Sequence, residues 1–165
     1  MIQAPTDSNT ALEDQAAQLY RVLTELIRVY QVRDRDRICC HDLTISQCNA
    51  LEALVRVGPM TLNDLAGHLY LDKSTTSRIV STLDRKKLTK RQANPADARS
   101  MLLAASPSGE GRVRAILASI VQREKQLLAE FDPEVRTALI NLIGRLAHAA
   151  SQRVSRSGGV CSCLE

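Results

Sequence analysis

The stretch over residues 61–106 constrains the fold most, because its periodicity changes from helix to strand within one short segment. Its first residue, Thr61, and then Asp72 each precede an apolar pattern of helical spacing, so each is predicted to cap a helix. Residues 89–92 and 101–104 are predicted as two short strands, joined by a turn at Asn94-Pro95-Ala96-Asp97. The stretch is therefore predicted to fold as two short helices followed by a β-hairpin.

Long amphipathic helices are predicted on both sides of this stretch. Before it, apolar residues alternate in steps of four and three over residues 10–36, at Leu12, Ala16, Leu19, Leu23, Leu26 and Tyr30. A shorter helix is predicted after Thr44. Beyond the hairpin, Ser106-Pro107 and Asp132-Pro133 each mark a helix start. The outer helices have roughly heptad seams, so we expect them to pair with each other and with a second copy of the chain.

The predicted fold class is mainly α: a winged helix-turn-helix whose wing is a short β-hairpin, with long N- and C-terminal dimerisation helices. Four segments are expected. They are an N-terminal dimerisation helix (1–40), the winged helix-turn-helix DNA-binding region (41–105), the C-terminal dimerisation helices (106–153) and a flexible, cysteine-containing tail (154–165).

The surplus positive charge of the chain lies within residues 61–106. The whole chain has 22 basic and 18 acidic residues, a net charge of +4. Eight of the basic and four of the acidic residues fall in this stretch, so the rest of the chain is balanced. A compact basic module is expected to meet phosphates. Aromatic residues make up only 2% of the chain, which argues against base stacking on single strands and favours duplex DNA.

Other classes of protein find little support in the sequence. No apolar run approaches membrane-spanning length and no signal peptide is recognised, so we expect a cytoplasmic protein without a membrane partner. No nucleophile elbow, phosphate-binding glycine loop or HExxH motif is present, so we expect no enzyme. A helical protein-interaction module without DNA binding stays open as the alternative, although it would not explain where the charge lies.

The helix predicted after Asp72 has two different faces. Thr76, Ile79, Val80 and Leu83 fall on the side expected to face the core, whereas Ser74, Ser77, Arg78 and Ser81 fall on the other side. Small polar side chains allow close approach to the major groove, and an arginine can donate two hydrogen bonds to guanine. Lys73 and Thr75, at the helix start, are expected to reach phosphate. The alternative is an ordinary solvated helix face.

Two motifs in this region resemble the MarR-type winged helix-turn-helix regulators. Residues 72–80 (Asp-Lys-Ser-Thr-Thr-Ser-Arg-Ile-Val) look like their recognition helix, and residues 94–100 (Asn-Pro-Ala-Asp-Ala-Arg-Ser) are similar to their wing motif. The resemblance implies that Arg99 enters the minor groove and that Asp97 orients the wing by pairing with a nearby arginine. Ala104-Ala105 departs from the family pattern, which more often has a larger apolar residue there.

The resemblance also implies how such a protein is used in the cell. It implies a homodimer that binds a palindromic operator in double-stranded DNA, and repression that is relieved by a small effector. That effector is expected to be either an organic anion bound between the dimer helices and the DNA-binding lobe, or an agent that acts on thiols.

Two close cysteine pairs suggest a thiol-based effector site. Cys39 and Cys40 are adjacent, and Cys161 and Cys163 lie near the end of the chain. Such pairs suit a thiolate-bound metal or metalloid ion, or an iron–sulfur cluster, and we hypothesise that the four residues form one sensor site. Thiol oxidation and simple core packing stay open as alternatives. No cofactor is expected to be required for folding.

Overall fold

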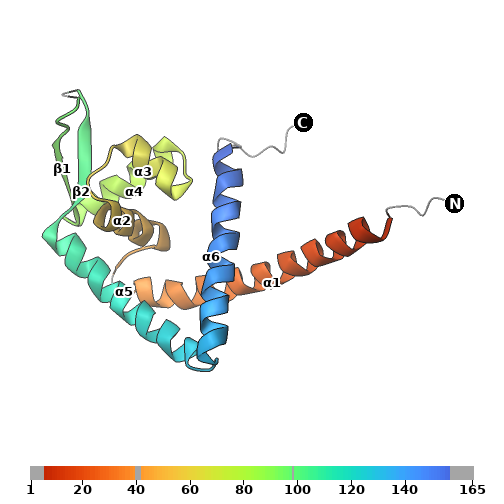
Figure 1. Cartoon of the computed structure of the whole chain (residues 1–165). Helices are drawn as coiled ribbons and strands as arrows, with labels where there is room; N and C mark the ends of the chain where they lie inside the picture. Colours follow the sequence, from red (N-terminus) through yellow and green to blue (C-terminus); the bar gives the residue numbers. More distant parts are fainter. Residues whose placement is uncertain (1–5, 40–41, 98, 157–165) are drawn as a thin grey trace. The chain divides into compact units, whose positions relative to one another are not determined.

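The computed structural model describes residues 6–39, 42–97 and 99–156. Its elements are α1 (Thr6–Cys39), α2 (Ile45–Val57), α3 (Leu62–Leu69), α4 (Lys73–Arg85), β1 (Thr89–Ala93), β2 (Met101–Ala105), α5 (Pro107–Leu128) and α6 (Pro133–Arg156) (Figure 1). The prediction of a mainly helical winged helix-turn-helix is confirmed. The chain divides into two compact units, residues 1–45 and 46–165, and the predicted four-segment division stays a prediction.

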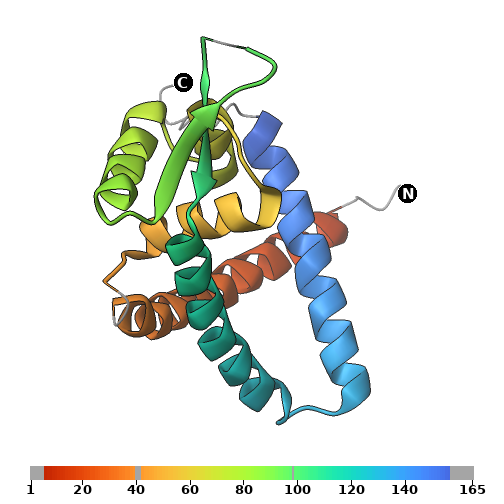
Figure 2. The ribbon, with the colours of Figure 1, turned by 90° about the vertical axis from the view of Figure 1, so that its left-hand side faces the viewer.

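The wing is an antiparallel hairpin in which Thr89 pairs with Ala105 and Ala93 with Met101. Figure 2 shows its turn projecting beyond α3 and α4. Met60 adds an isolated bridge on the outer side of β2, where Met60 and Leu103 exchange two backbone hydrogen bonds of 3.0 and 2.8 Å. This bridge could not be predicted, because a single extended residue carries no periodicity. It ties the segment before α3 to the root of the wing.

The core of the second unit lies where α2–α5 meet the sheet. Its fully buried large side chains include Leu51, Leu65, Leu83, Val113 and Ile116. Burial in α5 ends after the first few turns, since Val121 and Leu127 are exposed. In α6 several large apolar side chains are also exposed: Val135, Leu139, Ile140, Leu142 and Ile143. The single chain therefore buries the winged region well and leaves the outer helices with uncovered apolar surface.

The start of α5 is fastened to the chain just before β1. The Ser106 hydroxyl donates to the carbonyl oxygen of Lys87 (2.8 Å) and accepts from the backbone N–H of Gly109 (3.1 Å). The Ser106 N–H donates to the Leu88 carbonyl oxygen (2.9 Å). Gly109 lies so close that a Cβ atom there would stand 2.1 Å from that same oxygen. This junction fixes the base of the wing against α5.

Among the described residues, no helix is long and apolar enough to cross a membrane.

Candidate DNA-binding interface

Both helices of the helix-turn-helix begin at the predicted caps. Thr61 and Asp64 form a reciprocal capping box at the start of α3, in which each side chain bonds the other residue's backbone N–H. Asp72 caps α4 by accepting a hydrogen bond of 2.8 Å from the N–H of Thr75. Because these caps fix where each helix begins, they also fix which side chains the exposed face of α4 presents.

The Asp72 carboxylate binds two side-chain hydroxyls as well as the backbone. It accepts hydrogen bonds from the hydroxyls of Ser74 (2.6 Å) and Thr75 (2.7 Å), and these bonds hold the pKa of its carboxyl well below the usual value. Both hydroxyl groups therefore donate their protons to the Asp72 carboxylate. Ser74 and Thr75 can offer DNA only their oxygen lone pairs in this conformation, which sequence reasoning did not foresee. Lys73 is exposed beside them.

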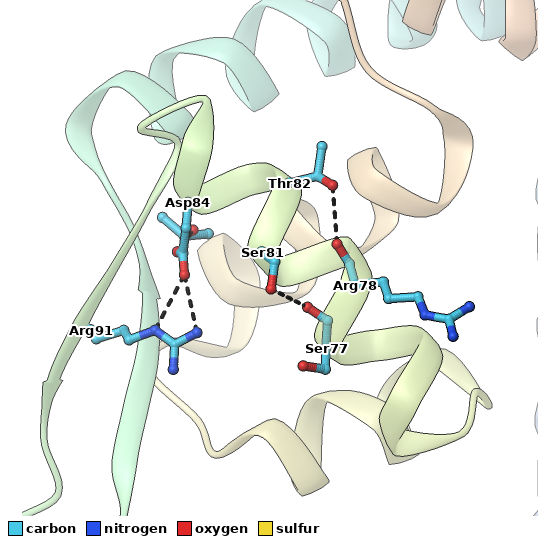
Figure 3. Close-up of polar contacts among 7 residues, drawn as sticks. Ser77, Arg78, Ser81, Thr82, Asp84 and Arg91 are labelled. Atoms are coloured by element: carbon cyan, nitrogen blue, oxygen red, sulfur yellow. Dashed lines mark hydrogen bonds and ion pairs between the residues drawn. The ribbon is translucent and has the colours of Figure 1, made fainter.

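The exposed face of α4 presents Arg78 among small side chains. Thr76, Val80 and Leu83 are buried, as predicted. The hydroxyl of Ser81 donates to the carbonyl oxygen of Ser77 (2.8 Å), and Thr82 donates in the same way to Arg78 (3.1 Å) (Figure 3). These hydroxyls therefore lie back along the helix. The Arg78 guanidinium extends from the helix (Figure 3) and has no partner among the described residues.

The tip of the wing is a closed network of hydrogen bonds. Asn94 accepts from the N–H of Ala96 (3.0 Å) and donates through Nδ2 to the hydroxyl of Ser100 (2.7 Å). Asp97 accepts from the backbone N–H of Arg99 (3.0 Å). The Asp97 carboxylate thus holds a backbone amide of the turn, and its predicted pairing with an arginine side chain stays a prediction. The Arg99 side chain is exposed at this tip.

An ion pair that sequence reasoning missed connects α4 to the wing. Asp84, in the last turn of α4, accepts from Nε (3.2 Å) and Nη2 (3.1 Å) of Arg91 in β1. Its other carboxylate oxygen accepts from the hydroxyl of Thr89. Figure 3 shows the pair beside α4. Helical spacing cannot predict this pair, because the contact crosses the end of a helix.

The predicted cysteine site lies largely outside the described residues. Cys40, Cys161 and Cys163 belong to the parts of the chain that the structure does not describe, and the side chain of Cys39 is not described either. Within the described ranges, no group of three or more histidine, cysteine or acidic side chains could hold a metal ion. Cys48, in α2, is buried. The thiol hypothesis therefore stays a prediction.

A groove of about 530 Å³ opens beside the wing in the second unit. Ala104 and Ala105 form part of its wall, so their small size leaves this space unfilled. Its charged lining residues are Lys90, Glu110 and Arg114. It combines apolar walls with cationic side chains near the base of the wing.

These features coincide with a known family, since residues 41–100 match the sequence model of the MarR family. The chain therefore resembles the MarR family over its winged helix-turn-helix region. It is similar to the HTH-type transcriptional regulator YxaD of Bacillus subtilis, with 28% identity over 127 residues that cover 77% of this chain and 89% of YxaD. The related YsmB of the same organism is 21% identical over 140 residues, which cover 85% of this chain and 96% of YsmB.

Solved structures share the fold. A MarR family protein from Bacillus stearothermophilus superposes with a TM-score of 0.77 at 21% identity, covering 84% of this chain and 97% of that one. The match extends well beyond residues 41–100, so the outer helices also follow the MarR architecture. The relatives YxaD and YsmB are both HTH-type transcriptional regulators.

Proposed function

We propose that this protein binds a palindromic operator as a homodimer and represses transcription from it. In each half-site, α4 would lie in the major groove and Arg99 at the wing tip would enter the minor groove. The observation that carries the proposal is the exposed face of α4, where an exposed Arg78 extends from the helix among small hydroxyl side chains. Such a face permits close approach and leaves one long donor to read guanine.

The homodimer is supported by the uncovered apolar surface of the outer helices. In α1, Leu12, Leu19 and Leu26 are spaced seven residues apart and are 63%, 44% and 41% exposed. Exposed apolar side chains also recur along α6. Contiguous apolar faces of this kind mark interaction surfaces. A twofold dimer would cover them and would place two copies of α4 to read two half-sites.

Arg78 and Lys73 provide the test of DNA reading. We expect Arg78→Ala to lower the preference for operator over scrambled DNA by about 1–3 kcal/mol, because Arg78 faces base edges. Lys73→Ala should weaken both duplexes about equally, because a phosphate contact carries no sequence information. The probe is a duplex selected in vitro from random sequence by the parent protein, and affinities are measured by fluorescence anisotropy at two salt concentrations.

Either of two results would change this assignment. If Arg78→Ala weakened both duplexes equally, Arg78 would be a phosphate contact and α4 would be rotated in the groove. If the parent protein selected no sequence from the random pool, the chain would act through protein contacts and not through DNA.

For the effector, we propose a thiophilic metal, metalloid or cluster bound by Cys39, Cys40, Cys161 and Cys163. The support is chemical: thiolates prefer soft ions, and each pair places two thiols close together in the sequence. Cys39 ends α1, the helix proposed to dimerise, so an ion bound there could change the spacing of the two α4 helices. Because binding displaces thiol protons, affinity should rise with pH near the thiol pKa.

Replacing Cys39 and Cys40 together by serine tests this effector. We expect DNA binding to persist while the release of DNA by arsenite, cadmium or zinc is abolished, because two of the four thiolates are gone. The measurement is anisotropy of the selected duplex during titration with each ion under anaerobic, reducing conditions. Full release of the double mutant by every ion that releases the parent would reject the thiol site.

An organic anion is the second candidate effector. The groove beside the wing favours it, because Lys90 and Arg114 could meet a carboxylate while Val113 and Leu117 contact an apolar ring. An anion bound in this groove would press on the two strands whose connecting turn carries Arg99. A serine double mutant that still responds to metal would make this candidate the better one.

A further inference from the structure

The wing strand β1 presents different side chains to its two sides. Thr89 and Arg91 point toward α4, where both bond Asp84. Lys90 and Gln92 line the groove that α5 helps to form. This alternation is the ordinary period of a strand. As a result, one cation of β1 is held by the recognition helix, while its neighbour Lys90 is exposed on the other side of the strand.

Asp84 is bound at both carboxylate oxygens. One accepts the Thr89 hydroxyl, and the other accepts two N–H groups of a single guanidinium. The Thr89 residue is buried, and the side chains of Asp84 and Arg91 are 29% and 53% exposed. An ion pair this exposed contributes little to folding stability. Three directed bonds to one carboxylate nevertheless restrict how β1 can turn relative to α4.

We propose that Asp84 is a positioning residue for DNA recognition: by holding Thr89 and Arg91, it sets the wing relative to α4 so that Arg78 and Arg99 can reach their grooves together. This inference rests on the proposed function. Arg91 is then a structural cation and not a phosphate contact, although it lies in the most basic part of the chain. Arg78 and Arg99, which lie outside these contacts, are left to meet DNA.

Electrostatics alone predicts the opposite effect of removing Asp84. The variant Asp84→Asn deletes a negative charge from a surface that meets phosphates, so a purely electrostatic view expects tighter binding to any duplex. A positioning role predicts weaker binding to the operator, because the wing is no longer held in place relative to α4. Binding to scrambled DNA should then be unchanged or stronger. The sign of the change in operator affinity therefore separates the two views.

The experiment measures the full-length protein against the selected duplex and a scrambled duplex of equal length over a range of salt. We expect Asp84→Asn and Arg91→Gln each to reduce the ratio of the two affinities by about tenfold, which corresponds to about 1.4 kcal/mol. The double variant should be no worse than either single one, because both remove the same contact. Thr89→Val, which deletes only the hydroxyl, should reduce the ratio less.

Lys90→Gln is the matched control, since it removes a cation from the same strand without changing Asp84, Thr89 or Arg91. It should leave the ratio unchanged, whether or not it weakens both duplexes and lowers the salt dependence. Melting curves of each variant show whether it is folded at the assay temperature. If Asp84→Asn fails to fold, Arg91→Gln and Thr89→Val carry the test in its place.

The outcomes distinguish this inference from the function beneath it. An unchanged affinity ratio in folded Asp84→Asn and Arg91→Gln, with a parent protein that does select a sequence, overturns the positioning role alone. So does an Arg91→Gln variant that behaves like a lost phosphate contact, weakening both duplexes equally. A parent protein that selects no sequence overturns the proposed function instead.

Discussion

Gly109→Ala is expected to destabilise the protein by about 3 kcal/mol or more, because the added methyl group would clash with neighbouring backbone. Its Cβ would stand 2.1 Å from the Leu88 carbonyl oxygen and 3.1 Å from a methyl group of Leu51. The carbonyl is backbone, and it already accepts the Ser106 N–H. Relief would require α5 to move away from the base of the wing, which would break that hydrogen bond.

Gly111→Ala is the matched control for this prediction. Gly111 lies two residues further along α5 and is exposed, with no heavy atom within 4 Å of the position its Cβ would take. Alanine favours a helix over glycine by up to about 1 kcal/mol, so this variant should be slightly more stable than the parent. Urea denaturation followed by circular dichroism, at one protein concentration, gives both values. Equal stability of the two variants would contradict the described junction.

The helix-turn-helix could be predicted because its signals are local. Thr61 and Asp72 are capping residues, and each cap bonds a backbone N–H three residues away. The change of period after α4 likewise gave the strands to within one residue of their observed ends. Propensity and short-range hydrogen bonding decide such features, so sequence spacing is enough to find them.

The contacts that position the interface could not be predicted in the same way. Asp84 meets Arg91 only because the chain turns at Lys87, which adopts a left-handed φ of 57°. No spacing rule joins a residue on a helix to one on the strand that follows it. The closeness of Gly109 to Leu88 depends likewise on how α5 returns to the start of β1. Tertiary packing sets both contacts.

These differences bear on function because they change which charged side chains are available to contact DNA. Eight basic side chains lie in residues 61–106, but Arg91 is paired with Asp84. Asp64 and Asp72 are occupied as helix caps, with their negative charges near the starts of α3 and α4. A count of charges indicates that the module meets DNA. The arrangement of the charges indicates which arginines remain to read it.

Leu19→Glu combined with Leu26→Glu is expected to abolish the homodimer and, with it, high-affinity operator binding. The two leucines lie seven residues apart on one face of α1 and are substantially exposed in the single chain. Burying each leucine in a dimer contributes about 2 kcal/mol, and each position counts twice in a symmetric interface. The variant would also bury unpaired carboxylates. The dimer should therefore weaken by roughly five orders of magnitude or more, which leaves a monomer at micromolar concentration.

Ala17→Glu combined with Thr24→Glu is the control for the dimer, because it adds the same two charges at the same spacing on the opposite face of α1. Sedimentation analysis should find this variant dimeric and the leucine variant monomeric. The monomer should bind a single half-site weakly and lose its preference for the intact palindrome, since one protomer presents only one α4 helix. A leucine variant that remained dimeric would show that the apolar face of α1 is covered by something other than a second copy. If the control also dissociated, the interface would be broader than this face, and α1 would be buried on both sides.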